Sequence, residues 1–599
     1  MSDRPRVLIE DWLPVAELGI ESRREAAPIP GQFPKLKTFH VWWARRPLAA
    51  CAGTILASVM PAWRPELAEL LPDRPEVQSE PEYHSWFLRL CGILGDPVGA
   101  KRASLAAKAR GTPLKDNPFT YKPAFKVSPT AEDIRLLHSL LVATWGEIPS
   151  VLDPTAGGGS IPYEAIRYGL PTTANDLNPV AASILRAGIA IPAQYGRSLE
   201  PALRLWGTKL VDRVAARLSE FFPSSTQNEL VLNYLFARTV ACPRTGKLIP
   251  LSPNWWLSKG SENVAVRLVT EREGQQLDAP EFEIVSGEVL DFDPTAGTIA
   301  GGDAVSPWDG LTVDGDYIKA EAQAGRMGSI LYAVAVRCKG KRQFRAASVV
   351  DLMSLNRAAL DLEDRLPGWL ADGIIPDEEI DTTSNYDRGH RLYGIRRWRD
   401  MFSPRQLLVH GTFVEEFGRI IPEVRAALSP GEADSILALL ALMQGKALDY
   451  NAGAVRWDPT RAQLSHVFEK HNFSFKWAFG EFEGARELYP WCLDQMIGAY
   501  EGIVGLLELT AGTLFGPSSP HAVPGPITVM SSTGGDLQTI SSGSTALVCI
   551  DPPYYDNVMY AELADYFYVW EKRTLGLVWP ELFSLDYSRD SGMRLPVSA

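Results

Sequence analysis

The alternation of apolar and polar residues predicts a chain of mixed helices and strands. Helical periodicity marks an alanine-rich segment, Leu48–Met60, and two later segments, residues 84–96 and 132–147. A short apolar strand is predicted at Pro149–Leu152, then a helix at Tyr163–Tyr168 and a second strand at Thr172–Ala174. These elements form a predicted βαβ unit, whose loops lie at the carboxyl ends of its strands.

The pattern changes after this unit and returns near the end of the chain. Residues 195–520 begin with strand-like runs at Val264–Val269 and Ile330–Val336, and become mostly helical over residues 400–515. Strands are predicted again at Ile527–Met530 and Ala546–Ile550. We therefore expect an α/β core that is interrupted by a large insertion, first mixed α+β and then helical.

The composition is that of a globular protein and excludes disordered and fibrous classes. Of 599 residues, 46% are hydrophobic and 22% are charged. No apolar run approaches the roughly 18 residues that a membrane span needs, and the N-terminus does not resemble a signal peptide. The six cysteines include no C-x-x-C pair. The expectation is a soluble protein of the reducing cytoplasm.

The net charge of −13 argues against a simple basic nucleic-acid binder. Local clusters matter more than the sum, however, and the sequence holds two of them. One comprises Arg337, Lys339, Lys341, Arg342 and Arg345; the other comprises Arg391, Arg396, Arg397 and Arg399, with Tyr393 and Trp398 between them. Each is either a solvated face or a contact to phosphate.

A glycine-rich segment, Asp153–Ser160 (DPTAGGGS), directly follows the first predicted strand of the βαβ unit. Gly157, Gly158 and Gly159 allow a sharp turn and the close approach of a ligand. The helix that follows offers free backbone N–H groups to a polar or anionic ligand. The alternative is an ordinary strand-to-helix turn.

An acidic residue, Asp176, ends the second strand, 23 residues after Asp153. In nucleotide-binding α/β folds, an acidic residue about 20 positions after the glycine loop accepts hydrogen bonds from ribose hydroxyls. The alternative is a turn or helix-capping residue, because the sequence Asp-x-Asn-Pro favours a turn.

The third motif, Asp551-Pro552-Pro553-Tyr554, follows the last predicted strand. Two prolines fix the backbone and remove two donors, which leaves the Asp551 carboxylate and the Pro552 carbonyl as a fixed pair of acceptors beside the aromatic face of Tyr554. Such a site suits a planar ring that carries an exocyclic amino group. A proline-rich turn is the alternative, but the three motifs in this order favour the functional interpretation.

These motifs resemble those of amino-methyltransferases. DPTAGGGS resembles their glycine-rich S-adenosylmethionine loop, ANDLNP their ribose-binding loop, and DPPYYD their catalytic motif in the form usual for N6-adenine methylation. FHVWWARRPLAAC, YGIRRWRDMFSPRQLL, FSFKWAFGEFE and DPPYYDNVMYAELADYFYVW resemble the bacterial adenine-specific DNA methylases that contain a zinc ribbon. The resemblance extends from about residue 7 to residue 577.

The resemblance implies a Rossmann-like methyltransferase sheet and a set of site residues. The implied catalytic residues are Asp551, Pro552, Pro553 and Tyr554. The implied S-adenosylmethionine-binding residues are Asp153, Pro154, Ala156, Gly157, Gly158, Gly159, Asp176, Asn178, Asp536 and Trp43. Trp42, Arg45 and Arg46 would complete the pocket from the N-terminal side, although core packing explains the two tryptophans equally well.

The implied reaction is direct methyl transfer from the sulfonium to adenine N6 in DNA. Asp551 and the Pro552 carbonyl would accept hydrogen bonds from the amino group and stabilise the developing charge. The target base would leave the duplex stack and rest on Tyr554. No metal and no covalent enzyme intermediate are expected.

The resemblance also suggests six segments. Residues 1–130 form a helical segment with the FHVWWARRP motif, 131–195 the first part of the methyltransferase core, and 196–400 an inserted region suited to target recognition. Residues 401–520 form a helical region, 521–577 the second part of the core, and 578–599 a polar tail.

The chain departs from the family in two places. The paired C-P-x-C-G zinc knuckles are represented by Cys242–Gly246 and Ser306–Gly310, which keep one of the four expected sulfurs. Cys338 is too isolated to replace a ligand, so no zinc is expected. In addition, only 45 residues follow Tyr554. This short end predicts an incomplete sheet, from a chain that is truncated, frameshifted or one half of a split enzyme.

The sequence therefore predicts a DNA N6-adenine methyltransferase of a restriction–modification or phage-defence locus, with a companion subunit or nuclease as a possible partner. A partner-dependent, non-catalytic subunit remains an alternative. Methylation of RNA and methylation of cytosine N4 are further alternatives, because the exocyclic-amine chemistry is the same.

Overall fold

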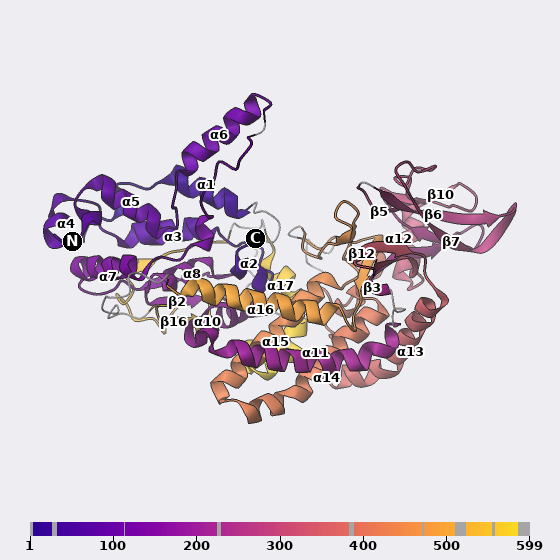
Figure 1. Cartoon of the computed structure of the whole chain (residues 1–599). Helices are drawn as coiled ribbons and strands as arrows, with labels where there is room; N and C mark the ends of the chain where they lie inside the picture. The colour runs from indigo at the N-terminus through magenta and orange to yellow at the C-terminus, as the bar shows by residue number, and fades with distance from the viewer. Residues whose placement is uncertain are drawn as a thin grey trace, which may run out of the picture. The chain divides into compact units, whose positions relative to one another are not determined.

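The computed structural model describes residues 4–26, 33–112, 114–223, 229–260, 262–381, 389–469, 472–509, 523–553 and 558–584 (Figure 1). The chain forms two compact units. Unit 1 comprises Met1–Pro201, Gln495–Val558 and Arg589–Ala599, and unit 2 comprises Ala202–Asp494 and Met559–Ser588. The divisions at 201 and 494 fall inside two helices, α11 (Glu200–Leu218) and α16 (Leu488–Leu507).

Unit 1 contains a small sheet of four parallel strands. They are β1 (Val151–Asp153), β2 (Thr172–Asn175), β16 (Ile527–Met530) and β17 (Leu547–Val548). Their order across the sheet is β16-β2-β1-β17. All four correspond to strands predicted from the apolar pattern. Strands β2 and β16 thus follow one another on one side of β1, and β17 pairs with the other side of β1.

Unit 1 also contains helices before and after β1. They are α1 (Val15–Ala26), α2 (Lys35–Phe39), α3 (Leu48–Val59), α4 (Pro65–Leu70), α5 (Glu80–Leu90), α6 (Pro97–Ala109), α7 (Ala131–Trp145), α8 (Ser160–Arg167), α9 (Pro179–Leu185) and α10 (Ile191–Tyr195). The three helices predicted upstream of the βαβ unit correspond to α3, α5 and α7. Buried side chains of α3, α5, α7 and α8 form one core together with Val151 of β1.

Local chemistry fixes the ends of these helices. Thr130 caps α7 by accepting the Asp133 N–H at 3.0 Å, and Gly146 ends it with φ of 79°. Proline at position 47 offers no side-chain cap to α3, and the buried Glu25 carboxylate takes this role by accepting the Leu48 N–H at 2.9 Å. The start of α3 therefore depends on a residue that lies more than twenty positions upstream.

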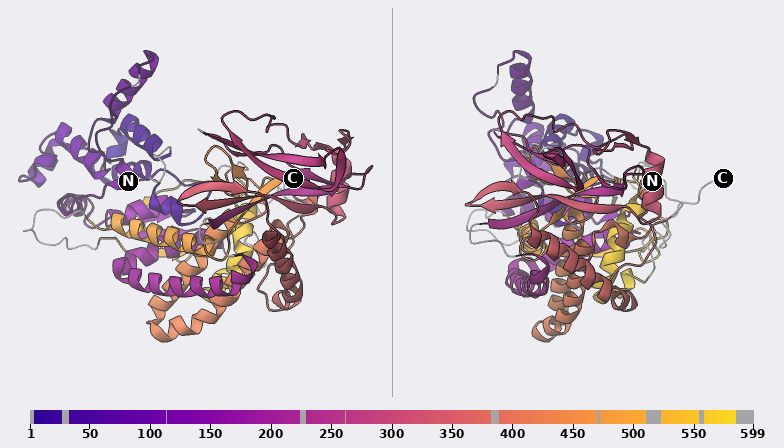
Figure 2. Two further views of the ribbon diagram at one scale, coloured as in Figure 1. Left: turned by 45° about the vertical axis from the view of Figure 1, so that its right-hand side comes forward. Right: turned by 90° about the vertical axis from the view of Figure 1, so that its right-hand side faces the viewer.

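Unit 2 is built around antiparallel sheets. The main sheet has the order β12-β11-β3-β15, with β4 also paired to β3, and a second sheet has the order β5-β6-β7. The strands, magenta to orange in Figure 2, are β3 (Glu229–Ala241), β4 (Leu248–Leu251), β5 (Trp256–Ser258), β6 (Asn263–Arg272), β7 (Gln275–Gly287), β8 (Ile299–Ala300), β9 (Asp303–Val305), β10 (Thr312–Val313), β11 (Gly328–Cys338), β12 (Lys341–Arg345), β13 (Trp457–Asp458), β14 (Gln463–Leu464) and β15 (Ala478–Phe482).

Helices pack around the main sheet of unit 2. They are α12 (Gly315–Gln323), α13 (Val349–Ala371), α14 (Pro404–Ala427), α15 (Pro430–Tyr450) and α17 (Tyr560–Thr574). The described residues between 400 and 509 are mostly helical, as predicted, but they also contribute β15 to the sheet. This strand pairs with β3, more than two hundred residues earlier, so its partner is not visible in local periodicity.

The chain is thus a mixed α/β protein with one small parallel sheet, several antiparallel sheets and many helices. None of the helices in the described part of the chain is both long enough and apolar enough to span a bilayer.

Candidate functional site

The motifs predicted from the sequence meet at one edge of the parallel sheet of unit 1. The glycine loop follows β1, Asp176 follows β2, Asp536 follows β16, and Asp551 follows β17. Because all four strands are parallel, their carboxyl ends lie at the same edge. The sheet therefore gathers side chains that are separated by up to about 400 residues in the chain.

The glycine loop makes a tight turn over the end of β1. Gly157 and Gly159 have φ of 51° and 83°, a conformation that L side chains rarely adopt. A Cβ atom on Gly157 would lie 2.5 Å from Nε1 of Trp42, and one on Gly158 would lie 2.7 Å from Cγ of Arg45. The N-terminal segment thus packs directly on the loop, and both glycines are needed for this contact.

Asp176 holds the glycine loop in place. One of its carboxylate oxygens accepts the Gly157 N–H at 2.8 Å, and the other accepts the Asn178 N–H at 2.8 Å. Asn178 in turn caps α9 by accepting the Val180 N–H at 2.9 Å. Each carboxylate oxygen has a second lone pair, so the turn-forming role of Asp176 leaves acceptor capacity for a ligand.

Asn175, at the end of β2, ties the neighbouring loops together. Its amide nitrogen donates to the carbonyl oxygens of Pro154 at 3.0 Å and Ser532 at 2.8 Å, and its amide oxygen accepts the Ser532 N–H at 3.0 Å. Asn175 is fully buried. Sequence reasoning missed this residue, although its place at the end of a buried strand was a usable signal.

Two carboxyl groups at this edge, those of Asp153 and Asp176, are buried, and the charge of a third, Asp551, acts on Asp153. Burial raises the pKa of Asp153 to about 7, and the charges of Asp176 and Asp551 raise it further against a hydrogen bond from Thr155. Burial likewise raises the pKa of Asp176 to about 6. A cationic ligand at this edge would favour the ionised form of both groups.

Asp551 forms an ion pair with Arg46, which belongs to the N-terminal segment. Both side chains are partly exposed, at 24% for Asp551 and 35% for Arg46. Pro552 and Pro553 are exposed to solvent, while Tyr554 lies outside the described residues. Asp551 is therefore accessible and already held by a cation.

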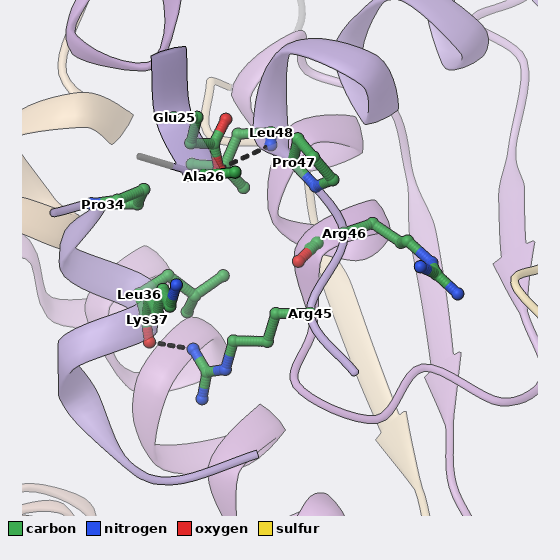
Figure 3. Close-up of a pocket in the computed structure, with 10 residues that line it drawn as sticks. Glu25, Ala26, Pro34, Leu36, Lys37, Arg45, Arg46, Pro47 and Leu48 are labelled. Carbon is green, nitrogen blue, oxygen red and sulfur yellow. Dashed lines mark hydrogen bonds between the residues drawn. The ribbon is translucent and has the colours of Figure 1, made fainter. Parts of the chain in front are cut away.

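Arg45 and Arg46 are neighbours in sequence but their side chains diverge (Figure 3). Arg45 donates to the carbonyl oxygens of Leu36 and His40, and so fixes the end of α2. Burial lowers its pKa to about 9, and within the described residues it has no carboxylate partner. A pocket lies between this segment and the start of α8, lined by Arg45, Arg46, Glu25 and Ser160, among others.

The remaining predicted residues occupy different environments. Pro154 and Ala156 lie in the glycine loop, where the Ala156 N–H donates to the Asn175 carbonyl at 2.8 Å. Asp536 is exposed in the loop after β16. Trp43 is buried, and it is Trp42 whose ring lies nearest to Gly157. The two rings are neighbours, with centroids 5.5 Å apart.

In unit 2, the two knuckle-like sequences form matching turns. Gly246 and Gly310 have φ of 73° and 72°, and each donates its N–H to the carbonyl four residues earlier, at 2.8 and 2.9 Å. Hydrogen bonds from Thr245 and Ser306 lower the pKa of Cys242 although burial opposes them. No group of three or more His, Cys, Asp or Glu side chains suited to a metal occurs among the described residues.

An ion pair joins the two turns. The Arg244 guanidinium donates to both carboxylate oxygens of Asp309, at 2.7 and 3.0 Å. Positions 242, 245, 306 and 309 thus carry a thiol, two hydroxyls and a carboxylate that already pairs with arginine. This ion pair thus connects the two turns directly.

The fold and site define a mixed α/β protein with a glycine loop and carboxylates at the carboxyl edge of a parallel sheet. Among family models, the one described as protein of unknown function (DUF1156) matches residues 12–87. Comparison with curated proteins and with solved structures gives no match. The matched segment includes Trp42, Arg45 and Arg46, which contact the glycine loop and Asp551.

Proposed function

We propose that the chain is an S-adenosylmethionine-dependent methyltransferase that methylates adenine N6 in DNA. The observation that carries the proposal is the meeting of the glycine loop, Asp176 and the Asp551-Pro552-Pro553 segment at one sheet edge. Each motif alone fits an ordinary turn, whereas their convergence provides a cofactor loop beside a pair of fixed acceptors.

The strand order supports this proposal. Numbered along the chain, the four parallel strands stand in the order 3-2-1-4, which is the order of the first four strands of Rossmann-type sheets. In such sheets, ligands bind outside the carboxyl ends, where the order reverses between the first and fourth strands. Here that position lies between the glycine loop after β1 and Asp551 after β17.

The residues present fit the cofactor. A sulfonium ligand is a cation, and Asp153 and Asp176 are buried carboxyls whose ionised forms a cation would stabilise. Gly157, Gly158, Asp153 and Asp176 would hold the cofactor, with Trp42 and Arg45 bordering it. When bound, it supplies an electrophilic methyl group.

The residues of the Asp551 loop would prepare the acceptor. The Asp551 carboxylate and the Pro552 carbonyl accept hydrogen bonds from the exocyclic amino group, which orients its nitrogen lone pair and stabilises the positive charge that develops on it. Arg46 holds the Asp551 carboxylate in a fixed orientation through their ion pair. The exposure of Pro552 and Pro553 allows a base that has left the stack to reach the acceptors.

A second candidate is a partner-dependent subunit. β17 contains two residues and forms an edge of the described sheet. Val548 in this strand and Ile550 after it are 55% and 48% exposed, and an exposed apolar edge of this kind favours pairing with another strand. An additional strand from a partner would cover them and complete the site.

The deciding experiment is methyl transfer by the purified full chain. Labelled S-adenosylmethionine and unmethylated duplex DNA are incubated with the chain, the DNA is digested, and N6-methyladenine is measured. Parallel reactions contain duplex RNA, and the digest is also examined for N4-methylcytosine. Asp551→Asn is the inactive control and Asp73→Asn, at an exposed position of the same unit outside the implied site, is the matched active control.

Cofactor binding is measured separately by calorimetry. Transfer that depends on Asp551 supports the enzyme. Cofactor binding without transfer to any nucleic acid favours the partner-dependent subunit, and absence of cofactor binding overturns both.

A further inference from the structure

The hairpin that joins β11 to β12 carries four exposed cationic side chains at its tip. β11 ends at Cys338 and β12 begins at Lys341, so the turn consists of Lys339 and Gly340, with φ of 49° and 79°. Positive φ at both positions is typical of a tight two-residue hairpin. Arg337, Lys339, Lys341 and Arg342 are all exposed.

The strand register places like charges opposite each other in this hairpin. Arg337 pairs in register with Arg342. Arg342 also donates to the carbonyl oxygen of Ala462, and partial burial of its guanidinium, together with the positive charge of Arg337, lowers its pKa. Like charges in directly opposite positions destabilise a strand pair. Glu487 lies within electrostatic range of Arg337, but no ion pair to any of the four cations occurs among the described residues. The stability of the hairpin therefore does not explain its charges.

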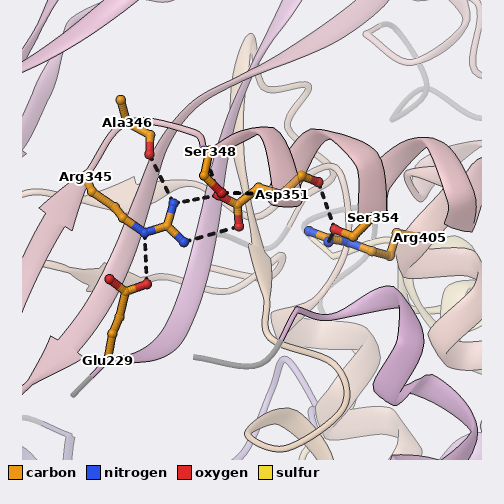
Figure 4. Close-up of polar contacts among 7 residues, drawn as sticks. All are labelled: Glu229, Arg345, Ala346, Ser348, Asp351, Ser354 and Arg405. Atoms are coloured by element: carbon orange, nitrogen blue, oxygen red, sulfur yellow. Dashed lines mark hydrogen bonds and ion pairs between the residues drawn. The ribbon is translucent and has the colours of Figure 1, made fainter. Parts of the chain in front are cut away.

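Arg345, at the far end of β12, differs from the cations at the tip. Figure 4 shows its guanidinium between Glu229 and Asp351, with hydrogen bonds of 2.9 Å to Glu229 and of 2.5 and 3.2 Å to Asp351. This arginine is neutralised inside unit 2 and fixes the start of α13. Within the described residues, the cations of this cluster that have no carboxylate partner are therefore those at the tip.

The second basic cluster of the sequence is neutralised only in part, because Arg396 is exposed while its neighbours form ion pairs. Arg397 and Arg399 both pair with Asp377, and Trp398 is buried. Tyr393 stacks on Phe475 with ring centroids 4.2 Å apart. Both aromatic residues of this cluster thus pack within the protein, and two of its arginines share one carboxylate. Of the two clusters, the hairpin tip is therefore the better suited to a ligand.

We propose that the tip of the β11–β12 hairpin binds the phosphate backbone of the nucleic-acid substrate. The identity of the partner rests on the proposed function. Successive side chains of a strand point to opposite faces, so Arg337 and Arg342 lie on one face of the hairpin and Lys341 on the other. A chain of net charge −13 repels a polyanion over much of its surface, and a local cluster of this kind supplies the attraction. Phosphate contacts carry no sequence information, so the hairpin adds affinity and leaves base selection to other residues.

The test measures binding of a labelled duplex DNA of random sequence to the full chain at increasing salt. In Arg337→Gln/Lys339→Asn/Lys341→Gln/Arg342→Gln, we expect at least about a tenfold loss of affinity near physiological salt, and a decrease of about two to four in the slope of log affinity against log salt. Asparagine is chosen at position 339 because it tolerates positive φ.

A matched control removes two cations that are equally exposed but neutralised. Arg272 and Arg326, in the same unit, pair with Glu281 and Glu321 at 2.8 and 2.6 Å. Arg272→Gln/Arg326→Gln should keep the wild-type affinity within about twofold, because paired cations release few counterions. If the larger variant does not fold, Lys339→Asn/Lys341→Gln, confined to exposed positions, should show about half of its change in slope.

An unchanged slope of log affinity against log salt in the hairpin variants would overturn the proposal. An equal loss of affinity in the control variant would also overturn it, because the effect would then come from the net charge of the chain. The parallel cofactor titration separates the two hypotheses. If the hairpin variants change the salt slope but the chain binds no cofactor, the phosphate-binding role of the hairpin is supported and the proposed methyltransferase function is refuted. If the chain transfers methyl groups and the hairpin variants bind DNA normally, only the role of the hairpin is refuted.

Discussion

The Arg46 guanidinium lies against the Asp551 carboxylate, although 505 positions separate the two residues in the chain. The pair links a segment matched by a family of unknown function to the loop with the fixed acceptors. It suggests that the matched segment forms part of the site. Since the ion pair orients the Asp551 carboxylate, Arg46 acts as a positioning residue in the proposed reaction.

Arg46→Gln should lower kcat by about 10- to 100-fold and leave the KM for S-adenosylmethionine nearly unchanged, because orientation of the acceptor is lost while the cofactor loop is kept. Arg46→Lys should recover part of the rate. The decisive measurement is a double-mutant cycle: in the Asp551→Asn background, Arg46→Gln should have little further effect. Additive losses would show that Arg46 acts independently of Asp551. Arg6→Gln removes another N-terminal arginine, which pairs with Asp11, and serves as the control.

Affinity for the cofactor should rise with pH. The pKa values of Asp153 and Asp176 are raised to about 7 and about 6, so both groups lose their charge as the solution becomes acidic. A cationic ligand binds the ionised forms better, and its dissociation constant should fall about tenfold between about pH 5.5 and about pH 8. Calorimetry at several pH values checks this. Asp176→Asn should flatten the dependence, whereas Asp73→Asn, at an exposed position outside the implied site, should retain it. A flat profile in the wild-type chain would contradict the assignment of both carboxyls.

Asp153→Asn should stabilise the ligand-free protein at high pH. A carboxyl whose pKa is higher in the folded state than in the unfolded state binds its proton more tightly when folded, so its contribution to stability is present below about pH 4 and is lost as the pH rises through about 7. Asparagine avoids the cost of a buried charge, and we expect a gain of roughly 2 kcal/mol near pH 8 that decreases toward about pH 5. Urea unfolding at the two pH values measures it. An equal effect at both would point to packing instead of charge.

The purified chain should contain no stoichiometric zinc, because Arg244 pairs with Asp309 and only one thiol remains at the two turns. Elemental analysis tests this directly. The turns themselves keep the matching geometry, so Thr245→Cys/Ser306→Cys/Asp309→Cys should bind one zinc ion per chain. One zinc in the wild-type chain would contradict the interpretation of these turns as a metal-free pair joined by Arg244 and Asp309. Absence of zinc from the triple variant would contradict the expected matching geometry of the turns.

Several parts of the site could be predicted from local sequence. Runs of apolar and β-branched residues bounded by turn residues located β1, β2, β16 and β17, because such residues favour the extended conformation. Three successive glycines indicated a backbone conformation that other residues avoid, and Gly157 and Gly159 adopt it. An Asp-x-Asn-Pro sequence indicated a turn, and Asn178 caps α9. These features depend on neighbours within a few residues.

The sequence by itself thus determined the strands, the turns and the types of side chain at the strand ends. Only the tertiary structure decided which of them meet: the order β16-β2-β1-β17, the contact of Trp42 with Gly157, and the pairing of Arg46 with Asp551. The tertiary structure also distinguished the two basic clusters. A cation is available to a ligand only where no carboxylate pairs with it, and Asp377 pairs with Arg397 in one of the clusters. Parallel pairing and ion pairs join residues far apart in the chain, and local periodicity carries no record of such partners.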